Sequence, residues 1–314
     1  MYDVVAIGEL LIDFTTASLQ PDGYPVMAAH PGGAVANFLA PLAKYGKKTA
    51  LISKVGKDAF GQLLLDTVSS LGIDVSGVHT TAEAFTTLAF VTLDSAGDRS
   101  FSFARKPGAD TCLAPADLDL TLIDSAKVLH FGSVSMTAEP SRSACKEAVR
   151  YAKSKGKLIS YDPNLREPLW DDPEEARSQI LWGLSLADVV KISDNEVEFL
   201  FGLPPAEGLM HMLRTFRAKL VFVTCGKEGC FFANRNGSGF VSNYTEGVET
   251  IDTTGAGDIF GGSALYRLLQ LEKAPEDLTP QELSDIASFA CKAASLSTAK
   301  AGGLSSVPDL SEVL

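Results

Sequence analysis

The chain has 314 residues, of which 46% are hydrophobic and 21% are charged, as is usual for a soluble globular protein. Its formal net charge of −12 argues against nucleic acids and anionic membranes as partners, although a local group of donors could still bind an anionic nucleotide. The five cysteines are scattered without zinc-ligand spacing, which favours buried, inert thiols in a reducing compartment.

The first predicted element is an apolar strand, Val4–Ile12, which begins almost at the N-terminus and ends before Asp13. No basic region with a cleavable apolar segment precedes it, and no later apolar run is long enough to cross a bilayer. We therefore expect a cytoplasmic protein without a membrane partner.

A glycine pair, Gly32 and Gly33, precedes a helical stretch that ends near Gly46. Paired glycines let a ligand approach the backbone closely, and the Asn37 side chain offers both a donor and an acceptor for hydroxyl groups. Taken alone, however, the segment is better explained as an ordinary junction between a loop and a helix.

The region from Phe85 to Phe103 differs from the rest of the chain because apolar and polar residues alternate in it. Two alternating runs flank Asp94–Asp98, whose composition is typical of a turn, so the region predicts a partly exposed antiparallel hairpin. Together with the stretch Asp13–His30, this hairpin could form a small β lid over the main domain. An edge hairpin of the main sheet is the alternative.

The middle of the chain alternates between short apolar runs and segments of helical period, which predicts a largely parallel sheet covered by helices. The apolar runs have the composition of strands that are buried on both faces. They are Lys127–Ser133, Lys157–Asp162, Asp188–Ser193 and Lys219–Thr224. The helical stretches between them are Glu139–Ser154, Pro173–Leu186 and Ala206–Arg217.

Polar side chains cluster where the predicted strands end. Asp13 follows the first strand, Asp162–Arg166 follows a later one, and Asn195 and Thr224 follow or end two more. In an open parallel sheet, ligands bind beyond the carboxyl ends of the strands. Because these residues share one edge of the predicted sheet, we expect a single binding site there.

The segment Ser193–Glu198 allows two interpretations. Ser193 and Glu196 form a capping box, which explains both residues as the start of a helix. That leaves Asn195 and Glu198 unexplained, and Glu198, about one turn along, is able to hold Mg²⁺ through water. From the residues alone, a structural and a functional role are equally supported.

The most specific motif is Asp252–Asp258, Asp-Thr-Thr-Gly-Ala-Gly-Asp, which a helical stretch follows. Its glycines let backbone N–H groups point to one place at a helix start, where the helix dipole favours a phosphate. A carboxylate at Asp258 would lie beside this anion site. Phosphoryl transfer needs that pairing, since it requires donors for the migrating group and a base for the attacking hydroxyl. The structural alternative is a Thr-capped helix with a dipole-favoured aspartate.

Together, the two glycine motifs resemble the ribokinase-like, or PfkB, family of carbohydrate kinases. The resemblance covers essentially the whole chain, and its motifs fall in the family's order and spacing. Three stretches look like fructokinases in particular, and they are Val128–Ser133, Leu158–Arg166 followed by Leu169 and Trp170, and Lys191–Glu196. The resemblance implies one α/β domain over residues 1–314, a three-layer α/β/α fold with a mostly parallel central sheet. A small β-sheet lid would come from inserted segments at about 13–30 and 85–107.

The resemblance also implies a role for each residue that matches the family's motifs. Asp258 would be the catalytic base that deprotonates the sugar hydroxyl, and Arg166 would lie near the path of the phosphoryl group. The anion hole would consist of Gly255, Ala256 and Gly257. The sugar site would be formed by Asp13, Gly32, Gly33, Asn37, Asp162 and, reaching in from the lid, Arg105.

The nucleotide would be bound at the other end of the site. Its implied contacts are Lys191, Asn195, Glu198, Thr224, Gly226, Gly229 and Cys291. Glu198 would hold Mg²⁺ through water, and Asp252 would belong to a site for a monovalent cation, K⁺. The family usually has Asn at the position of Cys291, so this substitution changes the nucleotide contact but not the chemistry.

The reaction implied is phosphoryl transfer from Mg²⁺-ATP to fructose. The same chemistry on 2-keto-3-deoxygluconate, ribose or a nucleoside is the nearest alternative, because related sugar pockets overlap. A catalytically inactive member that acts as a sugar sensor is an alternative of another class, although the intact Gly255–Asp258 argues against it. A dinucleotide-dependent dehydrogenase is excluded because no Gly-x-Gly-x-x-Gly follows the first strand.

Lids in this family often pair, so a homodimer through the lid is a further expectation. An apolar surface for such pairing would come from the lid phenylalanines, Phe85, Phe90, Phe101 and Phe103. The same side chains could equally pack within one subunit.

Overall fold

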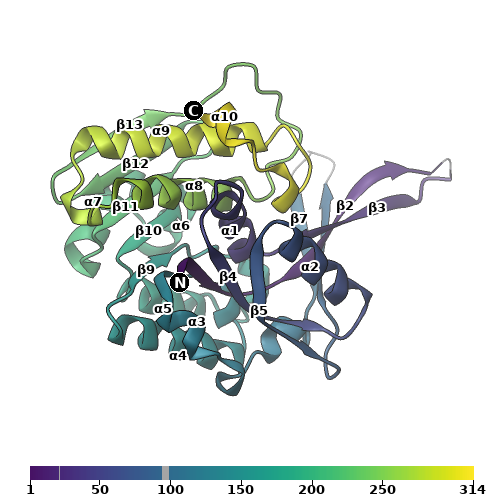
Figure 1. Ribbon diagram of the computed structural model, residues 1–314. Coiled ribbons are helices and arrows are strands. Elements are labelled where there is room, and N and C mark those ends of the chain that lie inside the picture. Colours follow the sequence, from purple (N-terminus) through teal and green to yellow (C-terminus); the bar gives the residue numbers. More distant parts are fainter. Residues whose placement is uncertain (21, 94–98) are drawn as a thin grey trace.

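The computed structural model describes residues 1–20, 22–93 and 99–314, and within them the chain forms two sheets. The larger sheet has the strand order β13-β12-β11-β10-β9-β8-β1-β4-β5 (Figure 1). From β11 to β5 all neighbours pair in parallel, while β12 and β13 extend the sheet in antiparallel fashion. The strands are β1 (Tyr2–Ile7), β4 (Thr49–Gly56), β5 (Ile73–Thr81), β8 (Ala126–Phe131), β9 (Leu158–Tyr161), β10 (Val189–Ser193), β11 (Leu220–Thr224), β12 (Gly229–Asn234) and β13 (Gly237–Ser242).

The predicted central strands are confirmed, because β8 to β11 coincide with the four apolar runs. The apolar runs are continuous because both faces of the sheet are buried. Along β1, for example, Val4 and Ala6 belong to one core cluster, whereas Val5 and Ile7 belong to the other. Successive side chains of a strand point to opposite faces, so the sheet separates two cores.

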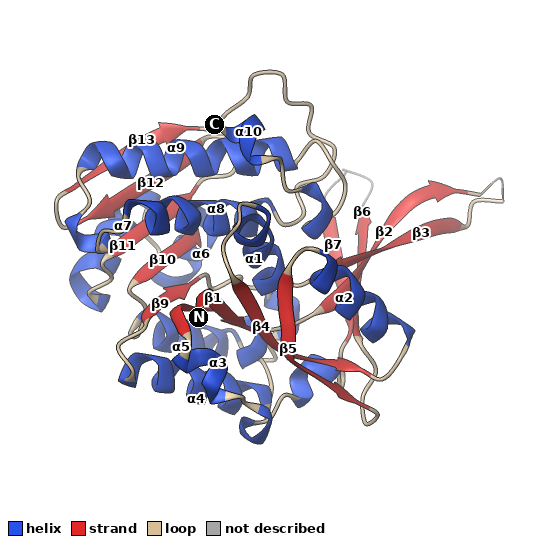
Figure 2. Cartoon of the chain, in the orientation of Figure 1, coloured by secondary structure: helices blue, strands red, loops and turns tan. Residues whose placement is uncertain are grey.

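Helices cover both faces of this sheet and complete the predicted three layers (Figure 2). One core contains residues of α1 (Ala34–Lys44), α2 (Ala59–Ser70), α8 (Ala256–Leu271), α9 (Pro280–Ser297) and α10 (Leu310–Val313). The other contains residues of α3 (Leu120–Asp124), α4 (Ser141–Ser154), α5 (Pro173–Leu184), α6 (Asp194–Phe201) and α7 (Pro205–His211).

The helical predictions hold with one difference. The stretches predicted at Glu139–Ser154 and Pro173–Leu186 are α4 and α5, but Ala206–Arg217 divides into α7 and a π-helical turn, Met212–Phe216. Arg217 ends that turn at a φ of 59°, in the left-handed region. In the described part of the chain, no helix is both long and apolar enough to span a membrane.

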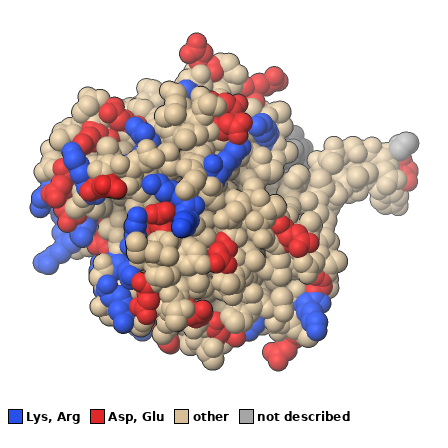
Figure 3. Space-filling view, in the orientation of Figure 1, with Lys and Arg blue, Asp and Glu red and all other residues tan. Residues whose placement is uncertain are grey.

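The smaller sheet is separate from the main one, so the lid prediction is confirmed and the edge-hairpin alternative is wrong. Its strand order is β3-β2-β6-β7, with a parallel β2–β6 pair between two antiparallel pairs. The strands are β2 (Leu11–Leu19), β3 (Pro25–Gly32), β6 (Thr87–Leu93) and β7 (Arg99–Ala104). The β2–β3 hairpin projects from the body as an arm with few charged atoms (Figures 1 and 3). The turn predicted at Asp94–Asp98 lies outside the described residues.

Candidate active site

The N-termini of α1 and α8 meet beside the carboxyl ends of the parallel strands. Gly33 is the N-cap residue of α1 and has a φ of 124°, and a Cβ there would lie 2.3 Å from the carbonyl oxygen of Glu9. Only glycine allows this close approach of two backbone segments. The glycine pair recognised in the sequence therefore brings α1 against the loop that joins β1 to β2.

Asp258 lies at the centre of this junction, in the first turn of α8, and it is buried. The Asn37 side-chain amide donates to Oδ2 at 3.0 Å, and the Asn164 amide donates to Oδ1 at 3.1 Å. Burial raises the pKa of Asp258, while nearby Lys191 and Arg166 act in the opposite direction. Two oriented donors and two nearby cations suit a carboxylate that accepts a proton during a reaction.

The start of α8 has the properties of an anion site. Its N-cap residue is Gly255, with a φ of 75° and no side chain to cap the helix, and Ala256 and Gly257 follow. The first N–H groups of a helix and the positive end of its dipole together favour a phosphate. The carboxyl group of Asp258 is attached to the same turn, as the sequence motif predicted.

Six of the residues predicted around the sugar and the phosphoryl group line one cavity of about 160 Å³, and they are Asp13, Gly33, Asn37, Arg166, Gly255 and Asp258. Burial raises the pKa of Asp13 to about 7, an effect that Arg166 partly offsets. Gly32 leaves room for Asp13, because a Cβ at Gly32 would lie 2.5 Å from Oδ2 of Asp13. The lid contributes Phe103 to the lining, so the lid and the main domain enclose this cavity together.

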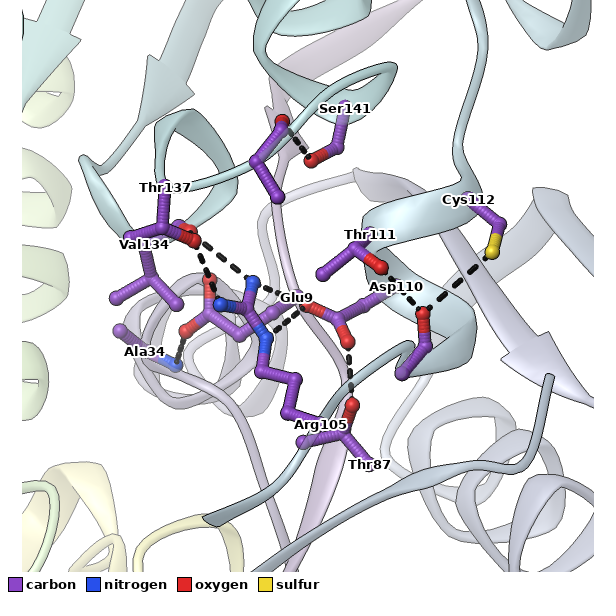
Figure 4. A network of polar contacts seen from close by, with 12 residues as sticks. Glu9, Ala34, Thr87, Arg105, Asp110, Thr111, Cys112, Val134, Thr137 and Ser141 are labelled. Atoms are coloured by element: carbon purple, nitrogen blue, oxygen red, sulfur yellow. Dashed lines mark hydrogen bonds and ion pairs between the residues drawn. The ribbon is translucent and has the colours of Figure 1, made fainter. Parts of the chain in front are cut away.

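Arg105 does not line this cavity. Figure 4 shows the polar contacts of its side chain instead. Its buried guanidinium donates to Asp110 through Nε and Nη2, at 2.9 and 2.6 Å, and to Thr137 and the carbonyl of Val134. These bonds attach the end of β7 to the main domain. The contact between Arg105 and the sugar stays a prediction.

A second cavity, of about 380 Å³, lies on the other side of the α8 N-terminus. Four predicted nucleotide residues line it, and they are Thr224, Gly226, Gly229 and Cys291. Ala256 and Gly257 line it as well, and Thr253 lines both cavities, so the Gly-Ala-Gly turn lies between them. Burial raises the pKa of the Cys291 thiol to about 12, so this side chain is a neutral group in the wall of the cavity.

An open groove beside the two cavities is lined by Arg166, Lys191 and Asn195. Lys191 Nζ lies 3.0 Å from Asp162 Oδ2, and both side chains are buried. Burial raises the pKa of Asp162 to about 7, an effect that Lys191 opposes. Asp162 lines none of these three cavities, which places it behind Lys191 and away from the predicted sugar contact.

The capping box at the start of α6 is present as the sequence indicated. Ser193 and Glu196 bond to each other reciprocally, and Glu196 also accepts the N–H of Leu165, at 2.7 Å. Glu198 is exposed one turn along α6. Of the two predicted ligands of Mg²⁺-ATP on this helix, only Asn195 lines the groove.

Asp252 joins the two loops that flank the anion site. Its Oδ1 accepts from the N–H and hydroxyl of Thr254, and its Oδ2 accepts from the N–H of Gly302, at 2.9 Å. These bonds hold the loop before α8 against the loop after α9. A cation at this place stays a prediction.

Sequence reasoning missed several residues that the structure places in the site. Asn164 is one of the two donors to Asp258, and its φ of 52° is uncommon for a non-glycine residue. Glu9 lines the sugar-side cavity, but the sequence placed it inside one predicted strand, Val4–Ile12, which the structure divides into β1 and β2 with Glu9 in the loop between them. Asn243 and Ser295, which bond to each other at 2.7 Å, line the second cavity from the loop after β13 and from α9, which are far apart in the sequence.

Comparison with known proteins identifies the fold and the family. The chain is 42% identical to fructokinase-1 of Oryza sativa subsp. japonica over 315 aligned residues, which cover 99% of this chain and 96% of the relative. Among solved structures, fructokinase from Xylella fastidiosa with bound ATP matches with a TM-score of 0.91 and 32% identity, over 100% of this chain and 97% of that one.

A double mutant of fructokinase from Vibrio cholerae O395, in a form with fructose, ADP and potassium ion bound, matches with a TM-score of 0.87 and 32% identity. That alignment covers 99% of this chain and 97% of the other. The family model described as pfkB family carbohydrate kinase matches residues 1–310. The chain belongs to the pfkB family of carbohydrate kinases.

Proposed function

We propose that this chain is a fructokinase, which transfers the γ-phosphoryl group of Mg²⁺-ATP to a hydroxyl of fructose. The observation that carries the proposal is the position of Asp258. Its carboxyl group lines the smaller cavity, and its helix begins with the glycine turn that lies between both cavities. Sugar in one cavity and nucleotide in the other would meet at this turn.

In the proposed reaction, a sugar hydroxyl attacks the γ-phosphorus and loses its proton to Asp258. A new bond forms between the sugar oxygen and phosphorus, the bond to the bridging oxygen breaks, and ADP leaves. Asn37 and Asn164 hold the carboxylate, one on each oxygen. The N–H groups at the start of α8 receive the charge on the transferring group, and Arg166 adds positive charge from the groove side.

Two ions belong to the proposal. Mg²⁺ would be held by the ATP phosphates and by water bound to Asn195 and Glu198, because Mg²⁺ keeps several waters and prefers oxygen ligands. Both residues lie exposed on the first turns of α6, so they suit contact through water. The loops that Asp252 joins would hold K⁺, by analogy with the potassium-bound relative.

Fructose is favoured as the acceptor because two fructokinases match this chain over 96% and 97% of their own length. The alternative acceptors, 2-keto-3-deoxygluconate, ribose and nucleosides, need the same base and anion site. An inactive sugar sensor is disfavoured, because a retired site has no reason to keep Asp258 between two oriented amides.

The experiment is to measure ADP release from Mg²⁺-ATP in the presence of K⁺ with fructose, 2-keto-3-deoxygluconate, ribose, glucose and adenosine in parallel. We expect the largest kcat/KM for fructose, and slower ADP release when Na⁺ replaces K⁺. A larger kcat/KM for another acceptor would keep the kinase mechanism and refute the choice of substrate. No turnover with any of them would support the sensor.

A further inference from the structure

Glu9 lies in the loop between β1 and β2 and lines the sugar-side cavity together with Asp13 and Asn37. The residue is only 3% exposed. One of its oxygens, Oε1, accepts the N–H of Ala34, the first residue of α1, at 2.7 Å. Glu9 therefore holds the glycine loop in place and at the same time forms part of the cavity wall.

The other carboxyl oxygen, Oε2, is buried and finds no hydrogen-bond partner among the described residues. Asn37 lines the same cavity, and its Oδ1 is also buried without a hydrogen-bond partner among the described residues. Buried polar atoms without a partner are rare in folded proteins, and each needs an explanation. Two such acceptors in one cavity wall indicate that the missing donors come from a bound molecule.

The guanidinium of Arg105 does not supply the missing donor. Arg105 attracts Glu9 electrostatically, but it donates to Asp110, Thr137 and the carbonyl of Val134 instead (Figure 4). Burial raises the pKa of Glu9 to about 7, because the backbone N–H groups of Glu9 and Ala34 and the charge of Arg105 offset only part of the lost hydration, and the charge of Asp110 adds to the increase. A buried acceptor without a donor is thus left on a residue that lines the cavity.

We propose that Glu9 is a substrate-binding residue whose Oε2 accepts a hydrogen bond from a hydroxyl of the sugar acceptor, and that it selects neutral sugars over sugar acids. This inference rests on the proposed kinase function. The donor it fits is a hydroxyl, because a carboxylate acceptor pairs with an O–H group and repels a negative charge.

The charges around the cavity support this selectivity. Among the described residues, its lining carries the carboxyl groups of Glu9, Asp13 and Asp258 against a single guanidinium, that of Arg166. An acceptor with a carboxylate of its own would add a like charge to this group in a partly enclosed space. Glu9 therefore favours fructose over 2-keto-3-deoxygluconate, which is the nearest alternative substrate.

The test uses the Glu9→Gln variant of the full-length chain. Glutamine keeps the shape and an oxygen for the N–H of Ala34, but its NH₂ group replaces the free acceptor with a donor. We expect KM for fructose to rise at least about tenfold, the loss expected for a hydrogen bond to a charged group. KM for ATP should stay within about twofold, and kcat/KM for 2-keto-3-deoxygluconate relative to fructose should increase at least about tenfold.

Thermal stability separates binding from a purely structural role. Removing an unpaired buried charge should leave the Tm of the ligand-free variant equal to that of the wild type or above it, while the Tm increase caused by fructose shrinks. The matched control is Asp110→Asn, which removes the paired carboxyl group of Arg105 outside the cavity and should lower Tm. A Glu9→Gln variant that loses Tm as this control does, with an unchanged KM for fructose, overturns the proposal.

A set of deoxyfructoses identifies the hydroxyl. The analogue that lacks the hydroxyl bound by Glu9 should have the same KM with the wild type and with Glu9→Gln, whereas the other analogues keep the difference. If every analogue keeps the difference in KM between the two proteins, the proposal is wrong.

Should Glu9→Gln fail to fold, Glu9→Asp is the second variant. It retracts the carboxylate by one methylene while keeping its charge, and it should raise KM for the same deoxyfructoses. A wild type that does not use fructose refutes the proposed function instead, before this comparison begins.

Discussion

Asp258 is a carboxyl group with little water around it, in the first turn of α8, where the helix dipole favours a negative charge. The amides of Asn37 and Asn164 make this possible, because each satisfies one oxygen. Neither amide can take up a proton, so a proton that reaches the carboxylate stays on it until it is released to solvent or product. This arrangement is what general base catalysis requires.

The Asp258→Asn variant tests this role. Asparagine keeps the shape but cannot accept the hydroxyl proton, so kcat with fructose should fall by about 10²- to 10⁴-fold, with a small change in KM. The measurement is steady-state ADP release, with Tm recorded in parallel. Tm should change little, because the loss of one hydrogen bond is offset by the removal of a buried charge.

A matched control is Asp188→Asn, at the opposite end of β10. Asp188 is also a buried aspartate, but it accepts the N–H of Ile159 and pairs with Lys153, away from both cavities. This control should lose stability and keep its turnover. If both variants keep near-normal turnover, Asp258 is not the base.

At the residue scale, the sequence predicted the reacting residues better than the residues that hold them in place. Asp258 and the glycine turn were recognisable because they form one short motif. Asn164 was not, because its partner is 94 positions away and its role exists only once β9 and α8 lie next to each other. Glu9 was missed for the same reason, since its burial depends on α1 packing over it.

At the scale of elements, the start of α8 depends on Gly255 for two reasons. Its φ of 75° lies in the left-handed region, and an added Cβ would lie 2.8 Å from the Cα of Gly303 and 3.2 Å from Asn37 Nδ2. The first effect is conformational, whereas the second is a collision with the backbone of a neighbouring loop and with a side chain of the site. Only the second should affect catalysis.

The variants Gly255→Ala and Gly46→Ala separate these effects. Gly46 follows α1 with a φ of 85°, and nothing lies within 4 Å of an added Cβ. We expect Gly46→Ala to lower the free energy of unfolding by about 1 kcal/mol with unchanged kcat. Gly255→Ala should be more destabilising and should lower kcat at least about tenfold, because α8 has to shift away from Asn37. Denaturant titration and ADP release measure both, and equal kcat values for the two variants would contradict the proposed anion site.

The elements themselves were largely predictable, but their arrangement was not. The strands β8 to β11 are recognisable in the sequence as apolar runs because each is buried on both faces. Nothing local in the sequence indicates that β1 lies between β8 and β4, since the two neighbours are separated by many residues. The parallel pairing of β2 with β6 likewise joins two hairpins that local patterns describe only one at a time.

At the scale of the molecule, the lid has an inner and an outer contact surface. Phe90 stacks on Phe14 with ring centroids 5.3 Å apart, so this side chain packs within one subunit. The arm is different, because Leu19 and Tyr24 are each 68% exposed and Val26 is 41% exposed. The visible face of the arm carries few charged atoms (Figure 3). Exposed apolar groups of this kind mark a surface that another molecule covers.

We propose that a second copy of the chain covers the arm, which makes the protein a homodimer through the lid. Leu19 pairs with Pro25 and Val26 with Ser18 across the hairpin, so Leu19 and Val26 point to opposite faces of the arm. The single variants Leu19→Lys and Val26→Lys therefore report which face is buried. A charge placed in an apolar interface should dissociate the dimer, because it would be buried without a partner.

Sedimentation velocity at micromolar concentration is the measurement. The wild type should sediment with twice the 33.3 kDa mass of one chain, and at least one arm variant should sediment as a monomer. Leu63→Lys is the matched control, because Leu63 is 39% exposed on α2, outside the arm, and this variant should remain dimeric. A monomeric wild type, or arm variants that stay dimeric, would refute the dimer through the arm and would mean that another molecule covers the arm. The lid of each copy would then have to close over its sugar without support from its neighbour.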